Sequence, residues 1–124
     1  MREPEHAMKK LIIALALGAA SFAAASSTFA ADIKRGEELA RKYNCAACHG
    51  ADFNKPIDPS YPKLAGQHAD YLAHALTAYK RGGGKANGRS NPIMAGQVQP
   101  LSNQDMIDIG AYLASLPSQL VISK

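Results

Sequence analysis

Two cysteines and a histidine stand close together in the run Cys45-Ala46-Ala47-Cys48-His49, and the 124-residue sequence contains no other cysteine. A Cys-x-x-Cys pair followed directly by histidine is the attachment pattern of a c-type haem. Positions three apart in a helical turn share a face, so both sulfurs can reach the two vinyl groups of one porphyrin and form thioethers. His49 can then bind the iron from the same side. The pattern predicts one covalently bound haem c per chain, with Cys45, Cys48 and His49 holding it.

Two other interpretations use the same cysteines. A Cys-x-x-Cys pair can be a thiol–disulfide redox couple, but that chemistry is typical of a βαβ context, and no alternating β-branched run near Cys45 predicts a strand. A zinc site would need further sulfur or nitrogen ligands at metal spacing, which the sequence does not supply. Haem attachment is therefore favoured, and thiol–disulfide oxidoreduction without haem remains an alternative.

Met94 is the candidate ligand for the other face of the iron. It lies in the glycine- and proline-rich stretch 82–101, which predicts a loop of nearly 20 residues. A loop of that length in a small domain needs a role, such as wrapping one face of a haem. A methionine thioether opposite histidine is the cytochrome c arrangement. Met106 competes, but it falls on the apolar stripe of a predicted helix, where methionine usually packs in the core. A lone histidine on a helix, such as His68 or His74, is usually exposed or hydrogen-bonded.

The elements that must position these residues are helical. Apolar residues recur at helical spacing in three segments, and no segment predicts a strand, so the expected fold is all-α with main helices over residues 33–44, 67–81 and 102–117. Asp32 can cap the first helix, which leads directly into the cysteines. Gly82 is the stop signal of the second. The third opens with Ser102 three residues before Asp105, which resembles a capping box.

The start of the chain has the pattern of a secretory signal peptide. Lys9 and Lys10 precede an apolar, alanine-rich run over residues 11–25, and small residues lead to a predicted cleavage site after Ala30. We therefore expect residues 1–30 to be removed on export to the bacterial periplasm, leaving a single domain over residues 31–124 without stable membrane insertion. Acidic residues before Met8 are unusual for a signal peptide, so either Met1 or Met8 can be the start.

The charge of the expected mature domain is only mildly basic. Residues 31–124 contain eleven basic and eight acidic side chains, a net charge of about +3 before any haem propionates. Nucleic-acid binding would need a dense basic stripe with stacking aromatics, so we expect no nucleic-acid partner. A small basic cluster in the second half of the chain is either a solvated loop or a docking patch for an acidic redox partner; it consists of Lys80, Arg81, Lys85 and Arg89.

The segment 61–67, Tyr-Pro-Lys-Leu-Ala-Gly-Gln, followed by Tyr71 and Leu72, adds a family resemblance. Together with the haem motif, Met94 and the third helix, it resembles class I c-type cytochromes, in particular the bacterial c-four type and its single-haem relatives. The resemblance implies a small class I cytochrome c fold, with three main helices and loops wrapped around one covalently attached haem. The c-four type carries two such domains in tandem, whereas this sequence has one attachment motif, so the oligomeric state stays open.

The same resemblance implies roles for further residues. The carbonyl of Pro62 would accept a hydrogen bond from His49, which fixes the ring and its tautomer. Leu64 would pack on the haem, and Gly36 and Tyr112 would lie where the first and last helices cross. The resemblance does not settle which basic residues meet the haem propionates, and neither Arg89 nor Lys85 is assigned to them.

Function follows from the closed ligation. With His49 and Met94 in both axial positions there is no open site for oxygen or peroxide, so the chain is expected to transfer single electrons and not to be an enzyme. We expect donor and acceptor redox proteins as partners, bound weakly and briefly. One alternative is a dedicated haem subunit of a larger dehydrogenase. Another is an enzyme or gas sensor, should Met94 dissociate readily.

Overall fold

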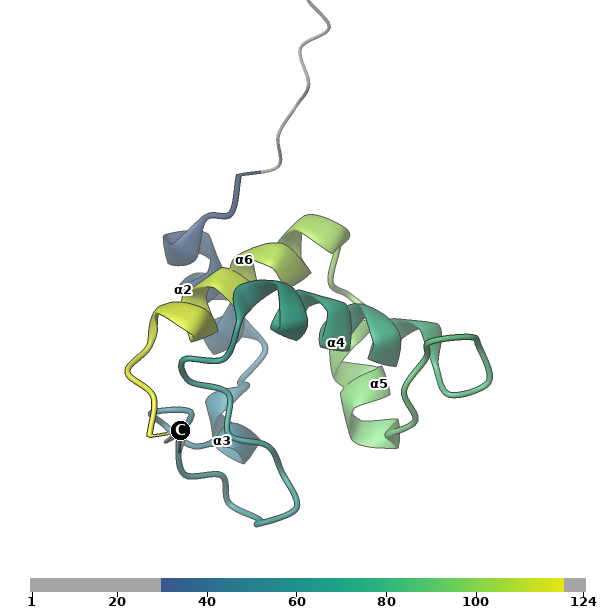
Figure 1. The fold of residues 1–124 in the computed structure, drawn as a ribbon, viewed down its shortest axis with the longest axis horizontal. Coiled ribbons are helices and arrows are strands. Elements are labelled where there is room, and N and C mark those ends of the chain that lie inside the picture. The colour runs from purple at the N-terminus through teal and green to yellow at the C-terminus, as the bar shows by residue number, and fades with distance from the viewer. Residues whose placement is uncertain (1–29, 120–124) are drawn as a thin grey trace, which may run out of the picture.

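The structure is a computed structural model that describes residues 30–119, so the expected signal peptide lies outside the described residues apart from Ala30. Within that range the chain is all-helical, without strands, which confirms the predicted fold class. The helices, shown in Figure 1, are α2 (Ile33–Lys42), α3 (Ala46–His49), α4 (Ala69–Arg81), α5 (Pro92–Val98) and α6 (Asn103–Ser115). No helix of residues 30–119 is both long enough and apolar enough to cross a bilayer.

Local sequence signals set most helix ends. The side chain of Asp32 accepts a hydrogen bond from the Arg35 N–H and so caps α2. Ser102 and Asp105 form a reciprocal capping box at the start of α6, as the sequence predicts. Gly82 ends α4 with φ of 80°, a backbone conformation that glycine adopts without steric cost.

The predicted loop over residues 82–101 is wrong in its second half, because α5 forms there. The Asn91 side chain accepts a hydrogen bond from the Met94 N–H, and Pro92 occupies the first turn. Asparagine before proline is a recognised helix start, but seven residues are too few for an apolar period to stand out. The first predicted helix is also shorter than expected, because Asn44 adopts a left-handed conformation with φ of 52° and turns the chain toward α3.

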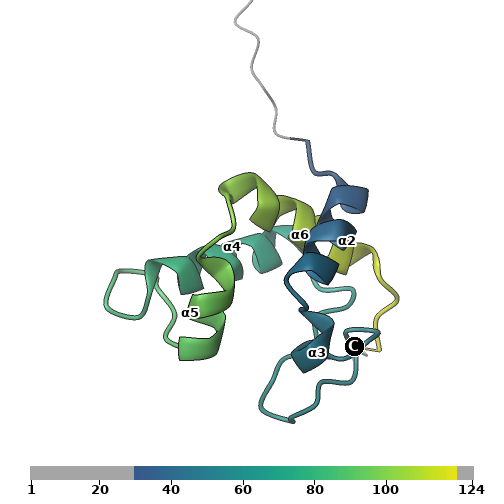
Figure 2. The same ribbon diagram turned by 180° about the vertical axis from the view of Figure 1, so that it is seen from behind.

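The long helices pack on one another through α6. Helix α2 crosses α6, and α4 also lies against α6, while α5 packs below α4 (Figure 1, and from behind in Figure 2). The crossing of α2 and α6 depends on Gly36, since a Cβ built there would lie 2.0 Å from the Asp108 carbonyl oxygen and 2.9 Å from Cβ of Tyr112. At the same helix crossing, Arg35 of α2 forms ion pairs with Asp105 and Asp108 of α6.

The core lies between these helices and the loop that follows α3. Its buried members come from every long helix and from the loops: Ala40, Phe53, Ala65, Leu72, Val98, Leu101, Met106, Ile109 and Leu113. Met106 is only 1% exposed. It therefore occupies the packing role that its place on the apolar stripe predicts.

Candidate cofactor site

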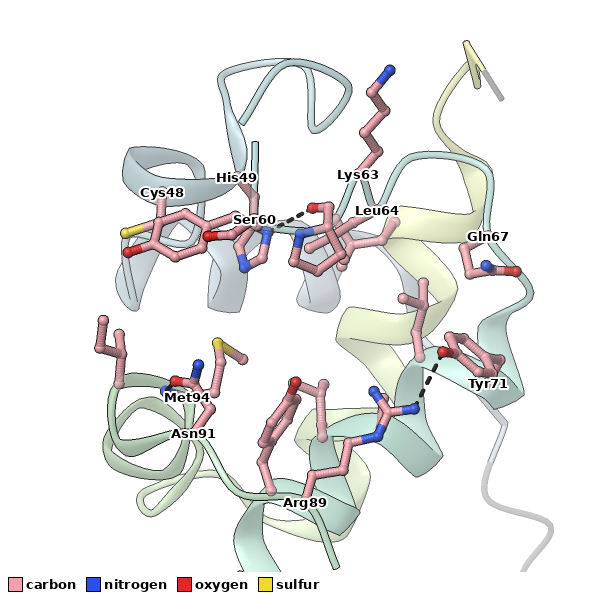
Figure 3. Close-up of a pocket in the computed structure, with 18 residues that line it drawn as sticks. Cys48, His49, Ser60, Lys63, Leu64, Gln67, Tyr71, Arg89, Asn91 and Met94 are labelled. Carbon is pink, nitrogen blue, oxygen red and sulfur yellow. Dashed lines mark hydrogen bonds between the residues drawn. The ribbon is translucent and has the colours of Figure 1, made fainter. Parts of the chain in front are cut away.

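A cavity of about 230 Å³ separates α3 and the following loop from α4 and α5. Figure 3 shows its two walls: Cys48, His49 and Leu64 on one side, and Asn91 and Met94 on the other. Five of the six predicted site residues line it, namely Cys48, His49, Pro62, Leu64 and Met94. The sixth, Cys45, lies one turn earlier and packs against the core.

His49 is buried, and its imidazole is held in one orientation. Its Nδ1 lies 2.9 Å from the carbonyl oxygen of Pro62. A carbonyl oxygen only accepts hydrogen bonds, so Nδ1 carries the proton and donates it. The other ring nitrogen, Nε2, then keeps its lone pair free for a metal ion. Figure 3 shows this ring directed toward the opposite wall of the cavity.

The turn after His49 brings Pro62 into reach. Gly50 has φ of 90°, and a Cβ there would lie 2.2 Å from the Lys55 carbonyl oxygen, so only glycine fits this turn. The Ile57 N–H donates to the Cys48 carbonyl oxygen at 3.0 Å, which folds the loop back on α3. The chain then returns past the histidine ring with Pro62 facing Nδ1.

Asn54 anchors this loop to the segment that follows α6, a role that the sequence alone did not predict. Its amide nitrogen donates to the Pro117 carbonyl oxygen at 3.0 Å, and its amide oxygen accepts from the Gln119 N–H at 2.9 Å. Asn54 is 4% exposed, so these bonds satisfy a buried polar group. Near Asn54 in the sequence, the Asp52 side chain accepts a hydrogen bond from the Asn54 N–H. This local pattern predicts a turn, but it does not predict the contact with the distant residues.

Met94 occupies the first turn of α5, and its sulfur faces the His49 ring across the cavity (Figure 3). The competing candidates lie elsewhere. The Met106 sulfur is 3.8 Å from the Thr77 hydroxyl within the core. His68 precedes α4 and His74 lies on it, both exposed and neither lining this cavity. Of the methionine and histidine candidates, only His49 and Met94 meet here.

The surroundings of Cys45 do not suit thiol redox chemistry. Burial raises the pKa of the Cys45 thiol, whereas reactive cysteines have a lowered pKa. The part of the chain that the structure describes also has no group of three or more His, Cys, Asp or Glu side chains able to hold a metal ion.

The donor set and the cavity walls fit a haem. One nitrogen and one thioether sulfur face each other across largely apolar walls, with a cysteine beside the histidine. Leu72, Leu76 and Tyr79 of α4 complete the apolar lining. A flat, apolar ring with a metal at its centre matches this arrangement, and the two cysteines can attach it.

Comparisons with known proteins agree with this chemistry. The family model described as "Cytochrome c" matches residues 33–117. Over 110 residues the chain is 41% identical to cytochrome c4 of Pseudomonas aeruginosa, covering 87% of this chain and 49% of that protein. It is 41% identical over 71 residues to cytochrome c-554(548) of Halomonas halodenitrificans, covering 57% of this chain and 82% of that one.

A solved structure shows the same similarity. The chain matches the crystal structure of reduced recombinant cytochrome c4 from Pseudomonas stutzeri with a TM-score of 0.62 and 39% identity, over 73% of this chain and 48% of that one. The chain thus spans about half the length of these two c4 proteins or less.

Proposed function

The chain belongs to the cytochrome c family, and on that premise we propose that it carries single electrons between redox proteins through one covalently attached haem c. The observation that carries the proposal is the pairing of His49 and Met94 on opposite walls of one cavity. A bound haem supplies a one-electron ferric/ferrous couple. The residues around the haem determine whether that couple only transfers electrons or also carries out bond chemistry.

We assign these residues as follows. Cys45 and Cys48 would form the thioethers, and His49 and Met94 would bind the iron. Pro62 holds the His49 ring through its carbonyl, and the partly buried Leu64 packs on the haem face. Two protein ligands leave no position for oxygen or peroxide, so the site transfers electrons and does not carry out bond chemistry.

When the protein holds both iron ligands in the same place before and after electron transfer, the structural change that accompanies the transfer is small. Nδ1 of His49 is already hydrogen-bonded to the Pro62 carbonyl oxygen. Met94 lies in the first turn of α5, and its N–H donates to the Asn91 side-chain oxygen at 3.0 Å. Methionine opposite histidine raises the reduction potential. The protein is thereby suited to accept an electron from a donor protein and pass it to an acceptor.

We propose the periplasm as its location, because the sequence combines a haem-attachment motif with a predicted export signal over residues 1–30. The donor would be a quinol-oxidising complex or a dehydrogenase, and the acceptor a terminal oxidase or reductase. A dedicated haem subunit of a dehydrogenase is the alternative. Gel filtration at high salt separates the two, since a free carrier elutes without a bound partner.

Optical spectroscopy of the purified protein tests the proposal. A pyridine assay on denatured protein reports thioether-linked haem, and the ferric methionine–iron charge-transfer band reports the ligand. Met94→Leu is expected to abolish this band, because leucine keeps the volume of methionine and lacks the sulfur.

Met106→Leu is the matched control. It makes the same substitution at the buried core methionine and is expected to keep the band. Survival of the band in Met94→Leu would overturn the ligand assignment, and absence of covalent haem from the native protein would overturn the proposed function itself.

A further inference from the structure

Arg89 reaches the cavity from the loop between α4 and α5. Its N–H donates to the Ala78 carbonyl oxygen at 2.9 Å, which ties the loop to the end of α4. Gly88 permits this approach, because a Cβ there would lie 1.9 Å from the Gly82 carbonyl oxygen. The loop therefore presents Arg89 at a fixed point of the cavity wall.

Two tyrosines of α4 orient the guanidinium. Cζ of Arg89 lies 5.5 Å from the Tyr71 ring centroid and 5.6 Å from that of Tyr79. Nη2 also donates to the Tyr71 hydroxyl at 3.2 Å. The Tyr71 hydroxyl occupies one N–H of a group with five N–H donors, and the Tyr79 side chain contacts the guanidinium as well. The remaining donors are available to a ligand.

The cavity offers Arg89 no anionic partner. None of its lining residues is aspartate or glutamate, and no carboxylate of residues 30–119 forms an ion pair with Arg89. Lys63, the other cationic residue of the lining, directs its ammonium away from the cavity (Figure 3). Because no acidic side chain of the cavity neutralises the Arg89 guanidinium, this arrangement indicates a ligand that carries negative charge next to Arg89.

The position of Arg89 identifies which part of a haem carries that charge. Figure 3 shows Cys48 at one end of the cavity and the Arg89 guanidinium, beside Tyr71, at the other. In a porphyrin of the haem type, the vinyl groups and the two propionate carboxylates occupy opposite edges. Attachment of the vinyl edge to the cysteines would place the carboxylate edge at the Arg89 end of the cavity.

We propose that Arg89 binds the haem propionates, with Tyr71 and Tyr79 holding its guanidinium in place. Arginine donates paired, charge-assisted hydrogen bonds to carboxylates, so the planar fork suits this role better than a lysine ammonium. Lys85 is excluded as the partner, because it is exposed, lies at the tip of the loop and is absent from the cavity lining. The inference rests on the haem attachment proposed above.

The test compares Arg89→Gln with Lys85→Gln in the holoprotein. Redox-difference infrared spectroscopy follows the propionate carboxylate bands, and potentiometry follows the reduction potential. Arg89→Gln is expected to shift the carboxylate bands and lower the potential, because an uncompensated negative charge near the iron favours the ferric state. Lys85→Gln removes the same charge from the same loop and is expected to leave both unchanged.

Arg89→Lys is an intermediate variant. It keeps the positive charge but loses the planar guanidinium with its paired donors. The reduction potential should therefore fall less than in Arg89→Gln, while the carboxylate bands still shift. Native-like bands and potential in Arg89→Gln, or equal shifts in Lys85→Gln, would overturn the assignment alone. Native protein without covalent haem would overturn both this assignment and the proposed function.

Discussion

The two ring nitrogens of His49 lie in different surroundings. Nδ1 is committed to the Pro62 carbonyl, and Nε2 is left for the iron. Removing such a partner of a ligating histidine commonly costs roughly 10–100-fold in metal affinity or activity. The interaction uses a backbone carbonyl, so substituting the Pro62 side chain does not delete it. The histidine side of the site is thus fixed by the fold, and Met94 is the ligand that a side-chain substitution can remove cleanly.

Met94→Leu is expected to let ferrous protein bind carbon monoxide at neutral pH, because loss of the sulfur leaves one axial position without a protein ligand. Native protein and Met106→Leu should both resist binding. Carbon monoxide difference spectra of the three reduced proteins provide the measurement. Equal binding by native protein and Met94→Leu would indicate that Met94 does not close the site, and would favour the gas-sensor alternative.

At the scale of elements, α2 and α6 cross with their backbones in close approach. The nearest neighbour of a Cβ at Gly36 is a backbone carbonyl of α6, which cannot move aside as a flexible side chain can. Gly36→Ala is therefore expected to lower the free energy of unfolding by roughly 1–3 kcal/mol. Chemical denaturation of the holoprotein measures this loss.

Gly96→Ala is the control for that substitution. Gly96 lies within α5 and is exposed, and a Cβ added there would have nothing within 4 Å. Alanine favours helix over glycine by about 1 kcal/mol, so this variant should equal or slightly exceed the native stability. A loss at Gly96 as large as that at Gly36 would contradict the steric explanation.

The ion pairs of Arg35 with Asp105 and Asp108 between α2 and α6 predict that the stability of the fold decreases in acid. Hydrogen bonds from Ser102, together with Arg35, hold the pKa of Asp105 below its usual value. Burial alone would raise the pKa of Asp108, but hydrogen bonds from the Asp32 N–H, Gln104 and Arg35 outweigh it and lower the pKa. A lowered folded-state pKa stabilises the protein above the unfolded-state pKa, and this contribution is lost as pH falls through the folded-state value.

Asp108→Asn should lower the free energy of unfolding at pH 7 by about 1–3 kcal/mol, because it removes a charged acceptor from a buried set of donors. Its stability should also fall less steeply than native stability below about pH 4, the range in which aspartates titrate. Denaturant midpoints of both proteins between neutral and acidic pH provide the comparison. Parallel pH profiles would show that Asp108 does not contribute to acid unfolding.

The sequence predicted the elements with long apolar periods and missed the short helix and the contacts between residues far apart in the chain. Capping residues and apolar periods located α2, α4 and α6, and a five-residue motif located the histidine side of the site. Helix α5 was missed because seven residues carry too little periodicity. The role of Asn54 could not be predicted, since its partners lie more than sixty residues away. The placement of Arg89 likewise depends on how the loop closes against α4.

At the scale of the molecule, α4 takes part both in the direct helix packing and in the wall of the cavity. Helices α2 and α4 pack directly on α6. In contrast, α5 and the loop after α3 face each other across the cavity, where Leu64, Leu76, Tyr79 and Met94 are only partly buried. A domain of roughly 90 residues buries a modest share of its surface. The haem therefore supplies apolar contacts that the chain lacks between these two walls.

Production of the double variant Cys45→Ala/Cys48→Ala without haem tests this dependence. A ligand that binds only the folded state stabilises it, so its removal should lower the denaturant midpoint markedly and reduce the helical signal in circular dichroism. The α5 side should be affected first, because fewer protein contacts join it to the rest. Hydrogen exchange would locate the change, with amides of α5 losing protection before those of α6. A haem-free variant with native midpoint and uniform protection would show that helix packing alone maintains the fold.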